Sequence, residues 1–217
     1  MSQIANKSRE RSEQKRSRET KSRILNAALT EFAAVGFEGS STRGIAARAG
    51  VNHTLITHHF GAKEALWKAT AAWVFENYTQ RMNDRLEGLH GVDEAAQVRI
   101  LLREFILICA DVPEFHRFMM QAGQGDSARL TWLAEHYLRE GTETEVGLVK
   151  RAQAHGLIPP GDPFHMRFLF INAAASIFAF ASEFSALSGK DPSSDAIVER
   201  HVDYVLNLFS SPTSATK

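Results

Sequence analysis

The chain contains little cysteine, and it lacks the short motifs of several enzyme classes. Cys109 is the single cysteine among 217 residues, so one chain cannot form an internal disulfide or a cysteine-rich zinc site. We find no glycine-rich phosphate loop and no Gly-x-Ser-x-Gly nucleophile elbow. His53, His58 and His59 lack the i, i+4 spacing of a helical zinc site, and no acid lies among them. We therefore expect no enzyme activity, no catalytic residue, no metal and no cofactor.

Long apolar runs are also missing. The most apolar segment, residues 168–182, contains Asn172, stops at Glu183 and is shorter than the roughly 20 residues that cross a bilayer. We interpret it as a buried helix. The basic amino terminus continues into polar residues instead of the apolar stretch of a secretory signal. These patterns predict a cytoplasmic protein with no membrane partner.

The sequence has helical rather than strand periodicity. No run of alternating polar and apolar residues indicates a sheet, whereas several segments place apolar residues three and four apart. With 44% apolar residues, the chain can bury a core. The predicted fold class is all-α, with helices expected at residues 93–111, 113–121, 126–154, 163–188 and 194–209 in the second part of the chain.

Charge is distributed unevenly, although the net charge is zero. Residues 1–67 hold 11 Lys or Arg against 6 Asp or Glu, which gives 11 − 6 = +5, and the remainder holds 14 against 19, which gives −5. Positive charge gathered at one end is typical of a phosphate-binding module. A solvated basic tail is the alternative, and the charge pattern alone does not choose between them.

The first 67 residues divide into an arm and three short helices. Residues 1–19 have almost no apolar side chains, so we expect a flexible basic arm. An amphipathic helix is predicted from Lys21 to Gly36. A second helix begins at Ser41 or Thr42 and ends at Gly50, and a third begins at Asn52 and ends before a further glycine at position 61.

Two short helices joined by a tight glycine turn form the helix-turn-helix arrangement, here with the turn Ala49-Gly50-Val51. In the second of these helices, Ile56 and Phe60 define the inward side. The side chains at positions 54, 55, 57 and 58 then face outward, and none of them is acidic. Such a face suits phosphates and base edges.

The stretches RILNAALTEFAAVGFEG, STRGIAARAG and VNHTLITHHFGAKEAL, within residues 23–66, resemble the DNA-binding domain of TetR-type repressors. The resemblance implies domains at 20–67 (helix-turn-helix) and 68–217 (helical, effector-binding and dimer-forming), after the arm at 1–19. The DNA contacts that it implies are Thr42, Arg43, Asn52, His53, Thr54, Leu55, Thr57, His58, His59 and Lys63.

Several of these positions carry a more specific expectation. Arg43 is a candidate for guanine O6 and N7, and Lys63 is expected to bind a backbone phosphate together with helix amide groups. Leu55 is expected to pack on a thymine methyl group. Two of the implied DNA contacts have another interpretation: Thr42 could be a plain helix cap, and His59 could have a structural role.

One position departs from the family pattern. The family usually has tyrosine where this chain has Thr57, so an interaction with phosphate is shortened, removed or taken over by His58. DNA affinity would then depend more on the arm. Deletion of residues 1–16 is expected to lower the affinity and to flatten its salt dependence.

The remainder resembles the family only in the number and lengths of its helices. In that family the last two long helices form a four-helix dimer interface. Its candidates here, some of which belong to the core of one chain, are Phe168, Ile171, Ala175, Phe178, Ile197, Val205 and Leu208. An effector pocket is implied among the middle helices, where an aromatic and methionine stripe is alternatively ordinary core. Its candidates are Phe105, Met119, Met120, Trp132, Tyr137 and Phe170.

Together these patterns predict a ligand-responsive transcriptional repressor. It would bind a palindromic double-stranded DNA operator as a homodimer and be released by a small-molecule effector, apolar or an amphipathic acid or its thioester. A TetR-like activator and a DNA-binding regulator without a ligand are the alternatives that the sequence leaves open.

Overall fold

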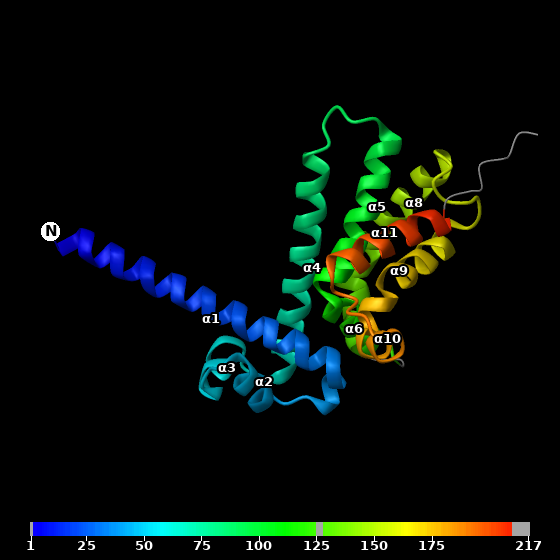
Figure 1. Ribbon diagram of the computed structural model, residues 1–217. Helices are drawn as coiled ribbons and strands as arrows, with labels where there is room; N and C mark the ends of the chain where they lie inside the picture. The colour runs from blue at the N-terminus through cyan, green and yellow to red at the C-terminus, as the bar shows by residue number, and fades with distance from the viewer. Residues whose placement is uncertain (1, 125–127, 210–217) are drawn as a thin grey trace, which may run out of the picture. The chain divides into compact units, whose positions relative to one another are not determined.

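The computed structural model describes residues 2–124 and 128–209, and within these ranges every regular element is a helix (Figure 1). The all-α fold class is therefore confirmed. The chain divides into two compact units, Met1–Phe75 with Phe118–Gly125, and Glu76–Arg117 with Asp126–Lys217. The first unit runs beyond the boundary expected after residue 67 and takes in a later segment. That segment belongs there because the Phe118 ring stacks on Trp67, with ring centroids 5.3 Å apart.

The first unit contains α1 (Ser2–Gly39), α2 (Thr42–Ala49), α3 (His53–Phe60) and the first half of α4 (Lys63–Glu87). Apolar residues at helical spacing turn inward from each helix and form one core. The side chains at its centre are all at most 1% exposed: Ile24, Leu29, Phe32, Ile45, Ile56, Leu66 and Phe118.

Helix α1 differs from expectation at both ends. It begins at Ser2, where we expected a flexible arm, and it continues to Gly39 across a kink at Gly36, whose φ of 69° and ψ of −178° are not helical. No proline or glycine precedes Gly36, so nothing in the backbone interrupts the helix. Lys15 and Glu19 form an exposed i, i+4 ion pair at 3.9 Å on this segment.

The second unit begins within α4 and continues through α5 (Glu94–Asp111) and the start of α6 (Pro113–Ala122). It then contains α7 (Ala128–Leu133), a π-helical segment η1 (Ala134–Leu138), α8 (Arg139–Ala154), α9 (Pro163–Ala179), α10 (Ala181–Ser188) and α11 (Asp195–Phe209). The helix expected at 126–154 thus includes a π-helical stretch, and its first two residues lie outside the described ranges. The helix expected at 163–188 is broken at Phe180, where α9 and α10 are bent by 65°.

No single helix in the described part of the chain is long and apolar enough to cross a membrane. The bent pair of α9 and α10 reaches the required length and composition only when its two members are taken together.

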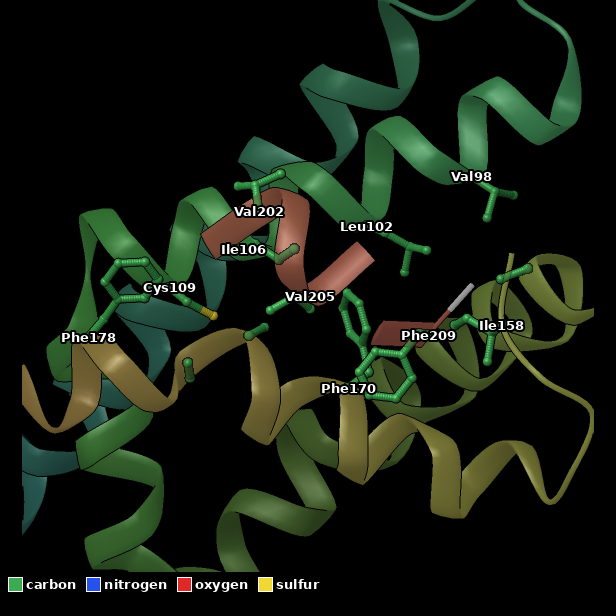
Figure 2. Close-up of a cluster of buried hydrophobic side chains, with 13 residues drawn as sticks. Val98, Leu102, Ile106, Cys109, Ile158, Phe170, Phe178, Val202, Val205 and Phe209 are labelled. Carbon is green, nitrogen blue, oxygen red and sulfur yellow. The ribbon is translucent and has the colours of Figure 1, made fainter. Parts of the chain in front are cut away.

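Helices α5, α9 and α11 supply most of the core of the second unit (Figure 2). Phe170 lies between the rings of Phe105 and Phe209, with centroids 5.9 and 5.5 Å away. Cys109 is buried in the same cluster, and burial raises the pKa of its thiol to about 12. The thiol is therefore uncharged near neutral pH, as expected of a structural cysteine.

A polar network connects three helices of this unit. The hydroxyl of Tyr78 on α4 donates to Glu145 Oε1 on α8 at 2.9 Å, and Arg167 Nε on α9 donates to Glu145 Oε2 at 2.5 Å. Burial and then the neighbouring Glu145 carboxylate raise the pKa of Tyr78 well above its ordinary value. The rings of Phe105 and Phe115 pack on Tyr78 at 6.2 and 5.9 Å. Glu145 is thus the shared acceptor that joins α4, α8 and α9.

Replacing Glu145 with alanine is expected to destabilise the protein by about 3 kcal/mol, because it leaves the mostly buried Arg167 cation and the Tyr78 hydroxyl without their acceptor. Glu143→Ala is the matched control, since Glu143 lies on the same helix and is exposed. Urea unfolding curves measure both variants. Equal stability of the two variants would show that the network contributes nothing specific.

Candidate DNA-binding site

Helix α2 is closed at both ends by local hydrogen bonds. The Ser41 hydroxyl accepts from the Gly44 N–H at 3.0 Å, so Ser41 is the N-cap and Thr42 is the first helical residue. Gly50 ends the helix in the left-handed conformation, with φ 61°, which glycine adopts at little cost. The interpretation of Thr42 as a plain helix cap is therefore wrong.

The turn between α2 and α3 is held by a residue that the sequence did not single out. Arg23 of α1 donates through Nη2 to the carbonyls of Ala49 and Gly50, at 2.6 and 3.2 Å. Because these carbonyls end α2 and open the turn, the contact fixes both helices to α1. In the sequence, Arg23 is one more cation in a basic segment, and no local signal separates it from the others.

The first turn of α3 is held by two side chains. Asn52 is its N-cap, and Oδ1 accepts from the backbone N–H and the hydroxyl of Thr54, both at 2.9 Å. His53 Nε2 lies 2.9 Å from Thr42 Oγ1, which connects the first turns of α3 and α2. Asn52, His53 and Thr42 were expected to contact DNA, and in the free protein each already has a partner within the motif.

The outward face of α3 is largely as expected. Thr54, Thr57 and His58 are exposed. Leu55, which we expected to face outward, is half-buried, and so is His59. This face has no acidic side chain.

The two adjacent histidines of α3 differ in environment. Their rings lie edge to face, with centroids 5.2 Å apart. Burial first, then His58 and Lys21, lower the pKa of His59. His59 is therefore a neutral ring near neutral pH that packs beside Phe60, with centroids 6.1 Å apart.

Lys63, expected to bind a phosphate, is used within the protein. Its ammonium donates to the carbonyls of Phe37 and Ser40 at 2.7 and 3.1 Å, and it lies 4.3 Å from the centre of the Phe37 ring. It therefore fastens the end of α1 to the start of α4. An ammonium has three N–H donors, so the two carbonyls leave at most one for another acceptor.

Arg43 and Arg48 of α2 have different surroundings. Arg43 is exposed, and among the described side chains none accepts a hydrogen bond from its guanidinium. Arg48 Nη2 instead pairs with Glu31 Oε2 of α1 at 3.2 Å. Arg43 is thus the arginine of α2 whose fork remains available for an external acceptor.

The expected effector-pocket residues are divided between the two units. Met119 and Met120 belong to the first unit, and the other candidates belong to the second. Phe170 is 5% exposed and part of the core. Trp132 of α7 and Tyr137 of η1 lie edge to face, with ring centroids 5.6 Å apart. An open hollow of about 660 Å³ occurs elsewhere, at the start of α9. Its lining residues are Gly161, Asp162, Phe164, His165, Met166 and Phe168.

The expected dimer-interface residues fall into two groups. Ala175, Phe178 and Val205 lie in the core of a single chain, because α9 and α11 turn these positions toward each other and toward α5. Phe168 and Leu208 are 49% and 71% exposed, and Ile171 and Ile197 are half-buried. Further apolar side chains of this region are exposed, although the sequence did not single them out. They are Phe164 and Leu169 on α9, Phe180 between α9 and α10, Leu187 on α10 and Tyr204 on α11.

Among the described side chains, no group of three or more His, Cys, Asp or Glu residues is placed to hold a metal ion.

Comparison with known proteins relates both units to bacterial regulators. A family model described as bacterial regulatory proteins, tetR family, matches residues 24–70. These residues comprise α1 from Ile24 onward, α2, α3 and the start of α4. The HTH-type transcriptional regulatory protein RaaS of Mycobacterium tuberculosis is 31% identical over 170 residues, which are 73% of this chain and 69% of RaaS. The HTH-type transcriptional regulator RutR of Escherichia coli is 27% identical over 193 residues, which are 87% of this chain and 88% of RutR.

Solved structures share the fold over most of the chain. AibR, crystallised in complex with isovaleryl coenzyme A and operator DNA, aligns with a TM-score of 0.68 at 18% identity and covers 89% of this chain and 99% of its own. A putative fatty acid metabolism regulator of Clostridium perfringens aligns with a TM-score of 0.66, also at 18% identity, over 88% of this chain and all of its own. The relation to RaaS and the family-model match to the helix-turn-helix show that the chain belongs to the TetR family of bacterial transcriptional regulators.

Proposed function

We propose that this regulator is a repressor that binds a palindromic operator as a homodimer and leaves it when a small-molecule effector binds. The observation that carries the proposal is the exposed, acid-free surface formed by Arg43 of α2 and by Thr54, Thr57 and His58 of α3. Helix-turn-helix proteins place such a surface in the major groove. The hydrogen bonds that Arg23 donates, that Asn52 accepts and that join Thr42 to His53 support this surface before DNA binds.

The role that we propose for each side chain of the motif depends on whether it already has a hydrogen-bond partner within the protein. Arg43 has an exposed guanidinium, whose planar fork matches guanine O6 and N7. Thr54, Thr57 and His58 supply small donors and acceptors for base edges or phosphates. Leu55 offers part of its side chain to a thymine methyl group. Lys63 positions α4 through the Phe37 and Ser40 carbonyls, and its remaining N–H and the amide groups of α4 meet a phosphate.

Arg43→Ala is expected to weaken binding to the selected operator by about 1–3 kcal/mol and to relax the preference at one base position of each half-site. Selection of bound duplexes from a random pool, followed by affinity measurements, tests this. Arg48→Ala is the control, because Arg48 pairs with Glu31 on the protein. An unchanged base preference in Arg43→Ala would remove the base-reading role of Arg43.

Dimer formation through α9 and α11 is supported by the apolar surface on their outer sides. Phe168 and Leu208 remain 49% and 71% exposed in a single chain, and large apolar patches on a surface mark interaction sites. The two helices are joined within the chain by His201, whose Nε2 lies 3.1 Å from the carbonyls of Ala173 and Ala174. A second copy, related by a two-fold axis, would cover the same patch on both protomers.

Phe168→Glu combined with Leu208→Glu is expected to convert a dimer into a monomer, because charged side chains would be buried without partners in the interface. Light scattering coupled to size exclusion gives the mass. The control is Leu86→Glu, at an apolar position of α4 with comparable exposure of 44%. A dimer that survives the double substitution would place the interface elsewhere.

Two neighbours support a proposal for the chemical class of the effector. The AibR crystals contain isovaleryl coenzyme A, and another neighbour is described as a putative fatty acid metabolism regulator. Tyr78, Phe105 and Phe115 form an aromatic cluster in the second unit, and aromatic side chains commonly line sites that bind apolar groups. We therefore propose an amphipathic acid or its thioester as the effector.

A thermal-shift screen is expected to show stabilisation by short-chain and medium-chain acyl thioesters or their acids, because a ligand that binds only the folded state raises the melting temperature. The same compounds should release the operator duplex. Stabilisation by neutral or cationic compounds alone would contradict the proposed effector class. Stabilisation without release would favour a regulator whose DNA binding does not respond to the ligand.

Repression and activation are separated by transcription measured from the selected operator with and without the regulator. We expect lower transcription when the regulator is present and recovery when the effector is added. Higher transcription in the presence of the regulator would identify an activator.

A further inference from the structure

The N-terminal part of α1 continues beyond the helix-turn-helix as a charged helix (Figure 1). Its side chains Arg11, Lys15, Arg16 and Arg18 are all exposed. The segment 11–18, RSEQKRSR, contains no apolar residue. A helix that is polar on all sides gains nothing by packing against a core, so its charges are free to meet an external partner.

Three of these cations share one face of the helix. At about 100° per residue, Arg11, Lys15 and Arg18 fall within an arc of roughly 60°, and Arg16 lies roughly 140° from Arg11. Lys15 is partly neutralised by Glu19 at 3.9 Å. We call Arg11, Lys15 and Arg18 the basic stripe. It rises about 10 Å along the helix axis, a distance over which one DNA strand presents roughly three phosphates.

Contacts near residue 20 fix the direction in which this helix leaves the motif. Arg23 is bonded to the turn before α3, and Lys21 Nζ lies 5.9 Å from the centre of the Phe60 ring at the end of α3. Lys21 also contributes to the lowered pKa of His59. The extension therefore starts beside the recognition helix, and α1 has no break between the two.

We infer that the extension of α1 is a second DNA-binding element, whose basic stripe lies along backbone phosphates that flank the bases read by α3. This inference rests on the proposed operator binding and goes beyond a general attraction of the basic arm, because it assigns the contact to one face of a helix. The partner is duplex DNA and not an anionic membrane, since a membrane-bound helix needs an apolar face, which residues 11–18 lack.

The test compares two double variants of the full chain that lose the same charge from the same helix. Arg11→Gln with Arg18→Gln removes the arginines of the stripe. Arg9→Gln with Arg16→Gln removes two arginines at positions that helical register places on the opposite side of α1. Each protein is titrated with a duplex selected from a random pool by the unaltered chain, in one form trimmed to the selected site and in another extended by about ten base pairs on each side.

On the extended duplex, the stripe variant is expected to bind more weakly, because its two substitutions remove cations that neutralise phosphates. The slope of log K against log salt is expected to shrink by about 1 for each phosphate that is no longer neutralised. The opposite-side variant is expected to keep the affinity and slope of the unaltered protein. All three proteins should bind the trimmed duplex equally.

Equal losses of affinity in both variants, or no loss in either, would overturn the assignment to one face. Loss of binding to phosphatidylserine vesicles in the stripe variant, with DNA binding unchanged, would assign the stripe to a membrane instead. Failure of the unaltered chain to enrich any sequence would overturn the proposed function itself, a result distinguishable from all of these.

Discussion

The hydrogen bonds from Arg23 to the carbonyls of Ala49 and Gly50 hold the DNA-binding motif together as a unit. Two helices of eight residues each bury too little surface to fix their own angle. One guanidinium on α1 satisfies the carbonyls at the point where α2 ends and the chain turns toward α3. The bond between Thr42 and His53 joins the first turns of α2 and α3, so it depends on the position of that turn.

Gly50 and Arg23 constrain each other. A Cβ atom on residue 50 would lie 3.2 Å from Arg23 Nη2, and the positive φ at that position already disfavours any side chain. Lys63 acts in the same manner where α1 ends, because its ammonium donates to the carbonyls of Phe37 and Ser40. Two basic residues in a DNA-binding unit thus serve the protein's own backbone. Counting cations therefore overstates the charge that is available to phosphates.

Local signals in the sequence were sufficient for many boundaries. Asn52 caps α3, Gly50 ends α2, and Pro113 and Pro163 open α6 and α9, because each depends on the backbone preference of one residue. The bend at Phe180 and the π-helical stretch at 134–138 have no such signal. Neither contains proline or glycine, so their geometry depends on packing between distant segments.

The candidate site shows the same division between local and long-range information. Helical register placed Thr54, Thr57 and His58 on the exposed face of α3. It could not show that Leu55 is half-buried or that Lys63 has carbonyl partners 23 and 26 residues earlier in the chain. It also could not separate Ala175, Phe178 and Val205 from the exposed positions of α9 and α11, because apolar residues that face the chain's own core look the same in sequence as residues that face a second copy.

The polar extension of α1 has a thermal consequence. The described side chains of residues 11–19 are exposed, so this stretch is held by backbone hydrogen bonds and surface pairs without burial of apolar area. Such a helix melts gradually on warming, whereas a motif with a packed core stays intact until cooperative unfolding. If the extension binds phosphates as proposed, the part of the DNA affinity that it contributes declines as temperature rises. The affinity for DNA would then depend on temperature well below the melting point of the fold.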